Sequence, residues 1–258
     1  MTVRAPALRA VRAVVLDTDG VVTDSAAVHA AAWKEAFDAF LAAGPPGDPA
    51  RRRPFDPGED YLRYVDGRSR LDGAASFLAS RGLRVPPEEV ERVAAEKERL
   101  FTRRLREGGV AAYPGTVRLL RVLRRDGVPA AAASASRHAR EVLASAGVLE
   151  WFGAVVDGVE AARLRLPGKP DPALFLEAAR RLGVPPGRCA VVEDALPGVE
   201  AGRRGGFGLV VGVDRTAGPG TGEALRRAGA GLVVRDLAEL LTGTPAAGGA
   251  GAEREARP

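Results

Sequence analysis

The chain has 258 residues, 46% of them hydrophobic and 28% charged, which is the composition of a folded globular protein large enough to bury a full core. Its single cysteine, Cys189, excludes an internal disulfide, and no apolar stretch approaches the ~20 residues of a membrane helix, so we expect a cytoplasmic protein with no membrane partner. The formal net charge is +5, but the arginines are scattered among acidic residues and only 5% of the residues are aromatic, which argues against a nucleic-acid partner and leaves a phosphorylated small molecule as the anionic partner.

The first predicted element is a strand over residues 11–19, and it ends in two acidic residues. A β-branched apolar run leads into Asp17 and Asp19, and Gly20 follows at once. Residues i and i+2 of a strand point to the same face, so both carboxylates can project from its carboxyl end, where open α/β sheets bind ligands. Two carboxylates held this close repel each other and need a counter-charge. We therefore predict a site for chemistry here, with a bound cation or perturbed pKa values.

A block without predicted strands follows, and helical patterns dominate it. Ser25 can cap the first of its helices, which ends before Gly44 and two prolines. A loop rich in proline, glycine and arginine then continues to about residue 58. The helices are predicted over residues 26–43, 69–81 and 86–107. We expect residues 26–107 to form an all-helical cap.

From residue 114 onward, predicted helices and strands alternate. The strands are predicted over residues 130–135, 154–156, 189–192, 209–213 and 232–234. The helices are predicted near residues 115–126, 137–146, 172–182, 197–204 and 221–228. This alternation is typical of βαβ units and predicts an α/β fold with a doubly wound parallel sheet. Residues 1–25 and 108–243 would form this core, with the cap inserted after the first strand, and residues 244–258 would be a disordered tail.

Polar side chains also stand at the carboxyl ends of later strands. Ser134 ends one strand, Glu193 and Asp194 end another, and Lys169 lies in a loop before a core helix. Because the carboxyl ends of parallel strands meet at one edge, we expect these groups to lie beside the two aspartates of the first strand. Carboxylate oxygens from two strands suit Mg²⁺, and a lysine with a serine hydroxyl can neutralise and orient a phosphoryl group. An aspartate can also act as a nucleophile that forms an aspartyl phosphate.

With these motifs in this order, the chain resembles the haloacid dehalogenase superfamily and, within it, the β-phosphoglucomutase-like sugar phosphatases and mutases. The motifs are Asp17-Thr18-Asp19-Gly20-Val21, Ser134-Ala135-Ser136, Gly168-Lys169-Pro170-Asp171-Pro172 and Val192-Glu193-Asp194. Each motif is weakly specific alone, but four in order, each at its expected place relative to the strands, are highly specific. The match covers residues 11 to about 215 and implies a Rossmann-like core with a helical cap.

The resemblance implies a role for each core motif. Asp17 is implied to be the nucleophile that takes the phosphoryl group, and Asp19 the general acid–base that protonates the leaving oxygen and then activates the acceptor. Ser134 and Lys169 are implied to hold the transferring phosphoryl group. The cofactor is implied to be Mg²⁺, and its ligands are Asp17, the main-chain carbonyl of Asp19 and Asp194, with Glu193 in or beside the shell.

The resemblance extends into the helical cap. The segment Val21-Val22-Thr23-Asp24-Ser25, followed by His29 and Trp33, looks like the hinge and first cap helix of β-phosphoglucomutases. The loop Gly67-Arg68-Ser69-Arg70 looks like the one that contacts the sugar phosphate, with its last arginine on the phosphate that is not transferred. Lys97 falls where the family has a cap lysine. The implied substrate-binding residues are His29, Trp33, Gly67, Arg70, Lys97, Ala135, Ser136 and Arg137.

One stretch departs from the family pattern, and some residues have simpler interpretations. Ser136, Arg137 and His138 stand where the family often has Ser-Lys-Asn, which keeps one cation but weakens the implied contact with a second phosphate. Asp24 and Ser25 fit a helix cap better than a catalytic role. The histidine, tryptophan, arginine and lysine of the cap also fit ordinary core or solvated positions.

Two functions fit these residues. The first is a β-phosphoglucomutase-like enzyme that interconverts β-glucose 1-phosphate and glucose 6-phosphate through a bisphosphate, and the second is a phosphatase that passes the phosphoryl group from Asp17 to water. The cap decides between them, and His29, Arg70 and Lys97 favour the mutase. A phosphoreceiver signalling domain is a distant alternative, which the helical insertion and Asp19 disfavour. The expected partner is a small phosphorylated sugar, and a monomer is the simplest state compatible with the sequence.

Overall fold

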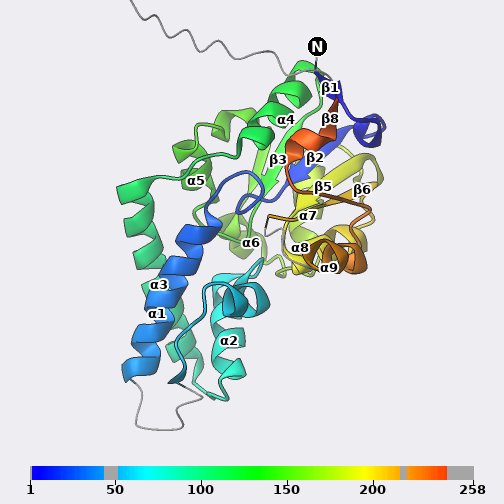
Figure 1. Ribbon diagram of the computed structural model, residues 1–258. Coiled ribbons are helices and arrows are strands. Elements are labelled where there is room, and N and C mark those ends of the chain that lie inside the picture. The colour runs from blue at the N-terminus through cyan, green and yellow to red at the C-terminus, as the bar shows by residue number, and fades with distance from the viewer. Residues whose placement is uncertain (1, 44–51, 216–219, 243–258) are drawn as a thin grey trace, which may run out of the picture.

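The computed structural model describes residues 2–43, 52–215 and 220–242, and six strands in these ranges form one parallel sheet (Figure 1). These strands are β2 (Ala13–Leu16), β3 (Ala130–Ala133), β4 (Ala154–Val156), β5 (Cys189–Glu193), β6 (Leu209–Val213) and β7 (Leu232–Val234). Their order in the sheet is β4-β3-β2-β5-β6-β7, so β2 lies between β3 and β5. The sheet therefore grows in opposite directions from β2, and this is the switch point at which doubly wound sheets bind their ligands.

Helices cover both faces of the sheet, and alternate residues of β2 contact the two layers. Val14 and Leu16 pack in the same cluster as Leu119 of α4, whereas Val15 packs with Phe175 of α7 on the other face. The helices of the core are α4 (Pro114–Arg125), α5 (Ala139–Ser145), α6 (Gly158–Leu164), α7 (Ala173–Arg181), α8 (Leu196–Arg204) and α9 (Thr221–Ala228). The predicted α/β class with a doubly wound parallel sheet is confirmed.

A helical body stands beside the sheet and has its own hydrophobic core (Figure 1). It contains α1 (Ala26–Ala43), a π-helical turn (Tyr61–Val65), α2 (Arg70–Ser80) and α3 (Pro87–Gly108). Aromatic rings fill its centre: the ring centroids of Phe37 and Phe77 are 4.1 Å apart, and those of Phe55 and Phe77 are 5.0 Å apart. We refer to this body as the cap.

Several short elements lie outside the predicted ones. Strand β1 (Val3–Arg4) pairs antiparallel with β8 (Leu241–Thr242). Helix α6 begins after Asp157, whose carboxylate accepts hydrogen bonds from the N–H groups of Val159 and Glu160 at 3.0 and 2.9 Å. Single 3₁₀ turns occur over Pro6–Leu8, Leu149–Trp151, Pro186–Arg188 and Leu237–Leu240. Segments this short do not contain enough residues to show a hydrophobic period.

Two expectations fall on parts of the chain that the structure does not describe. These are the tail over residues 244–258 and the first part of the predicted loop, residues 44–51. Among the described residues, no helix combines the length and the apolar content that crossing a membrane requires.

Replacing Phe77 by alanine should lower the free energy of unfolding by about 3–5 kcal/mol, because the change removes a fully buried ring and leaves a cavity in the cap core. Denaturant unfolding followed by circular dichroism measures the loss. Leu71→Ala, on the same helix but at a residue that is 39% exposed, is the matched control and should cost less than about 0.5 kcal/mol. Equal losses in the two variants would contradict this account of the cap core.

Candidate active site

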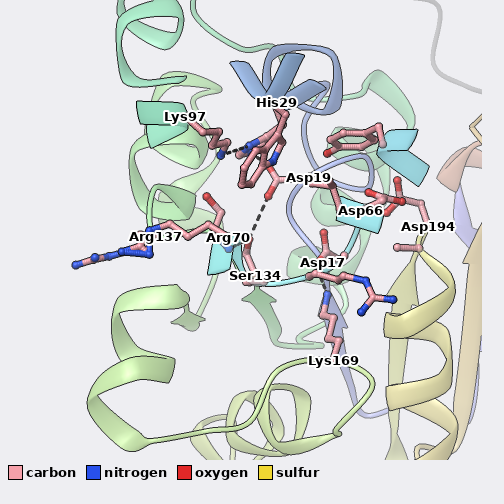
Figure 2. A pocket seen from close by; sticks show the side chains of 18 of the residues that line it. Asp17, Asp19, His29, Asp66, Arg70, Lys97, Ser134, Arg137, Lys169 and Asp194 are labelled. Atoms are coloured by element: carbon pink, nitrogen blue, oxygen red, sulfur yellow. Dashed lines mark hydrogen bonds and ion pairs between the residues drawn. The ribbon is translucent and has the colours of Figure 1, made fainter. Parts of the chain in front are cut away.

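One cavity lies between the cap and the carboxyl edge of the sheet (Figure 2). Every residue that the sequence singled out as catalytic, metal-binding or substrate-binding lines it. Further lining residues, which the sequence did not single out, are Tyr61, Val65, Asp66, Arg68, Glu98 and Ala195. Side chains from the two bodies therefore meet in a single space.

Asp17 directly follows the last residue of β2, and the strand is shorter than predicted. The ladder ends at Leu16, although the N–H of Asp17 still donates to the carbonyl of Val192 at 2.9 Å. The chain then turns, because the carbonyl of Thr18 accepts hydrogen bonds from the N–H groups of both Val22 and Thr23. The predicted strand over residues 11–19 is thus too long at both ends, and the two aspartates lie directly after the strand and in the turn that follows it.

A buried lysine joins two of the carboxylates. Lys169 Nζ donates to Asp17 Oδ1 at 2.5 Å and to Glu193 Oε2 at 2.7 Å, and all three residues are buried. Burial disfavours the ammonium, but the two carboxylates outweigh burial and raise the pKa of Lys169. Burial and the charge of Glu193 raise the pKa of Asp17 in turn. One ammonium therefore only partly compensates the negative charge collected here.

The remaining negative charge fits a hard cation. Ligand oxygens of Asp17, Glu193 and Asp194 all lie within 4.8 Å of one another. Burial first, and then the charge of Asp66, raises the pKa of Asp194, as expected for a buried carboxylate that lies beside other carboxylates. An all-oxygen donor set of this kind suits Mg²⁺. The oxygens of Glu193 already accept hydrogen bonds from Lys169 and from the N–H of Ala195 at 3.0 Å, so Asp17 and Asp194 are the better ligands.

Gly20 makes room for this cluster. Its φ of +83° lies in the left-handed region, and a Cβ at this position would stand 1.8 Å from Oδ2 of Asp194. A side chain at residue 20 would therefore displace the carboxylate that is best placed to bind a cation.

Asp19 is held by groups from both bodies. The Ser134 hydroxyl donates to Oδ2 at 3.1 Å, the Ser25 hydroxyl donates to Oδ1, and His29 Nε2 lies 3.2 Å from Oδ1. Burial would raise the pKa of Asp19, but the His29 contact and the two hydroxyls outweigh burial and lower it. Ser25, which the sequence assigned to a helix cap, thus directs its hydroxyl into the site.

Lys97 determines which ring nitrogen of His29 carries the proton, because it contacts the nitrogen that faces away from Asp19. Lys97 Nζ lies 2.9 Å from His29 Nδ1, and an ammonium can only donate, so the histidine proton resides on Nε2 and faces Asp19. Burial and then the charge of Lys97 lower the pKa of His29, which keeps the ring neutral. Lys97 is itself only 4% exposed, and its burial lowers its pKa to about 8. Trp33, also buried, lies with its ring 5.5 Å from the ammonium.

The residues expected to contact a second phosphate are arranged differently. Arg70 Nε lies 3.7 Å from Glu98 Oε2, and the other oxygen of Glu98 lies 3.1 Å from Nε2 of His138 in the core. Arg137 is exposed, and Figure 2 shows its side chain directed away from Asp17. His138, which directly precedes α5, thus pairs with a carboxylate of the cap.

Asp66 is the main addition to the predicted set. It follows the π-helical turn and lies beside Asp194 (Figure 2), and burial followed by the charge of Glu193 raises its pKa to about 7. The next residue, Gly67, approaches the core so closely that a Cβ would stand 2.8 Å from the Cβ of Ala195. The only sequence signal for Asp66 is its position next to the Gly67–Arg70 loop.

Comparisons with known proteins agree with this geometry. The model of the haloacid dehalogenase-like hydrolase family matches residues 11–206. The chain is 43% identical to the β-phosphoglucomutase of Mycobacterium bovis over 240 residues, covering 90% of this chain and 92% of the relative. It is 32% identical to the β-phosphoglucomutase of Bacillus subtilis, covering 89% and 91%. A hydrolase from Pseudomonas syringae has a similar structure, with a TM-score of 0.72, 27% identity and coverage of 89% and 95%.

Replacing Gly20 by alanine should weaken binding of Mg²⁺, because the new Cβ overlaps the carboxylate of Asp194. A ligand at 100 times its dissociation constant stabilises a protein by about 2.7 kcal/mol, so the loss is measurable as a smaller Mg²⁺-dependent rise in melting temperature.

Gly127→Ala is the matched control for this change. Gly127 also has a positive φ of 66°, but a Cβ there meets no atom within 4 Å. Both variants should lose about 1–2 kcal/mol through backbone strain, and only Gly20→Ala should lose the response to Mg²⁺. An undiminished Mg²⁺ response in Gly20→Ala would show that the cation binds elsewhere.

Proposed function

The chain belongs to the haloacid dehalogenase-like hydrolases, and on that premise we propose that it transfers the phosphoryl group of a sugar phosphate through Asp17, as a β-phosphoglucomutase. One observation carries the proposal: Asp17 pairs with Lys169 of the core, whereas its neighbour Asp19 is held both by Ser134 of the core and by His29 of the cap. A proton carrier whose position depends on the cap is what an enzyme needs if it transfers a phosphoryl group to a bound sugar and excludes water.

The two aspartates have different environments that suit different roles. The lowered pKa of Asp19 keeps this carboxylate ionised, so it can accept the proton of a sugar hydroxyl as that hydroxyl attacks the phosphoryl group on Asp17. The oxygen–phosphorus bond to Asp17 breaks as the bond to the sugar forms, which gives a sugar bisphosphate. Asp17 then takes the other phosphoryl group, and Asp19 returns its proton to the oxygen that leaves.

Positioning and charge compensation supply most of the catalysis in phosphoryl transfer. Lys169 and the hydroxyl of Ser134 are placed to hold the phosphoryl oxygens above Asp17. Asp17, Asp194 and the main-chain carbonyl of Asp19 would hold Mg²⁺, with Glu193 beside them to orient Lys169. The cation would supply the positive charge that brings an anionic substrate next to a carboxylate nucleophile.

The size of the cavity implies that the cap moves. Its volume is about 70 Å³, which is well below the roughly 300–1,000 Å³ of small-molecule sites and too little for a sugar phosphate. The substrate therefore enters when the cap opens, and closure brings His29 onto Asp19. This arrangement favours transfer to a bound hydroxyl group over transfer to water.

A phosphatase with the same mechanism is the second candidate. Arg70 pairs with Glu98, and the Arg137 side chain points away from Asp17, so the expected second-phosphate contacts are not assembled in this arrangement. A phosphatase needs no such contacts, because water replaces the sugar hydroxyl as the acceptor.

The two candidates predict different products from one assay. With β-glucose 1-phosphate, Mg²⁺ and a trace of glucose 1,6-bisphosphate, we expect glucose 6-phosphate to form without equivalent free phosphate. Asp17→Ala should be inactive, and Asp19→Ala should be slower by about 10²–10⁴-fold. Free phosphate without the isomer would refute the mutase and leave the phosphatase, whereas activity in Asp17→Ala would refute the aspartyl phosphate.

The rate should depend on the charge of Lys97. As the pH rises through about 8, its ammonium loses a proton, the neutral amine can accept from His29 Nδ1, and the histidine proton can leave the nitrogen that faces Asp19. We expect kcat/KM to fall about tenfold for each pH unit above this pKa. Lys97→Arg stays charged and should move the fall to higher pH.

Lys34→Arg serves as the control for the pH profile, because Lys34 lies on the same cap but pairs with Asp38 at 2.8 Å near solvent. It should keep the fall near pH 8. A Lys97→Arg profile that coincides with that of Lys34→Arg would contradict the assigned role of Lys97.

A further inference from the structure

A second hollow lies outside the reaction cavity, along one face of α3. Its volume is about 670 Å³, which is within the usual range for small-molecule sites. Among the described residues, the arginines that line it are Arg70, Arg99, Arg103, Arg106 and Arg137. Its lining carboxylates are Glu98 and Glu107. We call this hollow the arginine groove.

The spacing of arginines along α3 concentrates positive charge in the groove. Arg99, Arg103 and Arg106 recur at intervals of four and three residues, so their side chains line one face of α3. Arg99 pairs with Glu96 at 2.6 Å and Arg103 with Glu35 at 3.2 Å, near solvent. Such exposed pairs are weak and can exchange for a stronger anion.

Two of the groove's cations have no such partner. Within the described ranges, neither Arg106 nor Arg137 takes part in an ion pair or a side-chain hydrogen bond, and both are exposed. The groove therefore presents unpaired guanidinium groups from the cap and from the core.

The groove and the reaction cavity share a wall. Arg70, Glu98 and Arg137 line both spaces, and Glu98 is held between Arg70 and His138. A phosphate group in the groove would thus be separated from the catalytic groups by side chains alone. Exchange of the Arg70–Glu98 contact for an Arg70–phosphate contact would connect the two spaces.

We propose that the arginine groove is an outer phosphate-binding site that holds the sugar bisphosphate while its two ends exchange places. Guanidinium groups bind phosphate with paired N–H donors, and two phosphate groups need several such forks. The identity of this ligand rests on the proposed mutase function, in which the bisphosphate has to turn around between two transfers at one Asp17. A site directly outside the closed cavity retains the intermediate near the enzyme during that turn.

The test removes two groove charges without touching the catalytic or substrate-binding groups. Arg99→Gln/Arg106→Gln is compared with Arg92→Gln/Arg104→Gln, which removes the same charge from parts of α3 outside the groove. Calorimetric titration with glucose 1,6-bisphosphate, without Mg²⁺ so that no turnover occurs, should give about tenfold weaker binding for the groove variant. The control variant should bind like the native chain, and equal affinity in both variants would overturn the proposal.

A second measurement separates this proposal from the proposed function. During turnover of labelled β-glucose 1-phosphate with unlabelled bisphosphate, the groove variant should release several-fold more label into the free bisphosphate than the control. Equal release would overturn the retention role even if binding is weakened. If the native chain forms only free phosphate, the mutase function fails, while the titration still decides whether the groove binds phosphate groups.

Discussion

The contact of one buried ammonium with two buried carboxylates is the interaction on which the active site depends. Lys169 lies between Asp17 and Glu193, and all three are more than nine-tenths buried. Removing one member of such a group would leave an uncompensated charge in the interior, which is strongly destabilising. The switch point beside β2 supplies the strand ends that hold these side chains. The topology of the sheet therefore determines where the charges of the site gather.

The pair of aspartates shows how two like residues acquire different roles. Asp17 forms its ion pair with the core, because its partner Lys169 comes from a core loop. Asp19 directly precedes Gly20 in the turn, and one of its partners, His29, comes from α1 of the cap. Cap movement would therefore leave the proposed nucleophile Asp17 in place and change the surroundings of the proposed proton carrier Asp19. The choice of acceptor is then controlled by the cap rather than by the nucleophile.

The sequence predicts what depends on local pattern and on motif order. The alternation of strands and helices was sufficient for the doubly wound sheet, and the short polar motifs at strand ends identified residues that do line one cavity. It did not predict how side chains of the cap pair with the core. Glu98 and His138 are 40 positions apart and meet only because α3 packs over the start of α5, and Ser25 turns from its expected cap toward Asp19. Asp66 has no periodic pattern or motif that would mark it.

The contacts that close the cap combine attraction with repulsion. Glu98 and His138 attract each other across the two bodies, and Gly67 permits close packing against Ala195. Asp66, in the same loop, brings a carboxylate beside the one on Asp194, and like charges in a buried site oppose closure. Positive charge placed among these carboxylates reduces that repulsion, so cation binding and cap closure favour each other by linkage. Under the proposed function, a cap balanced in this way can open for each exchange of sugar phosphate and still exclude water when the phosphoryl group is transferred.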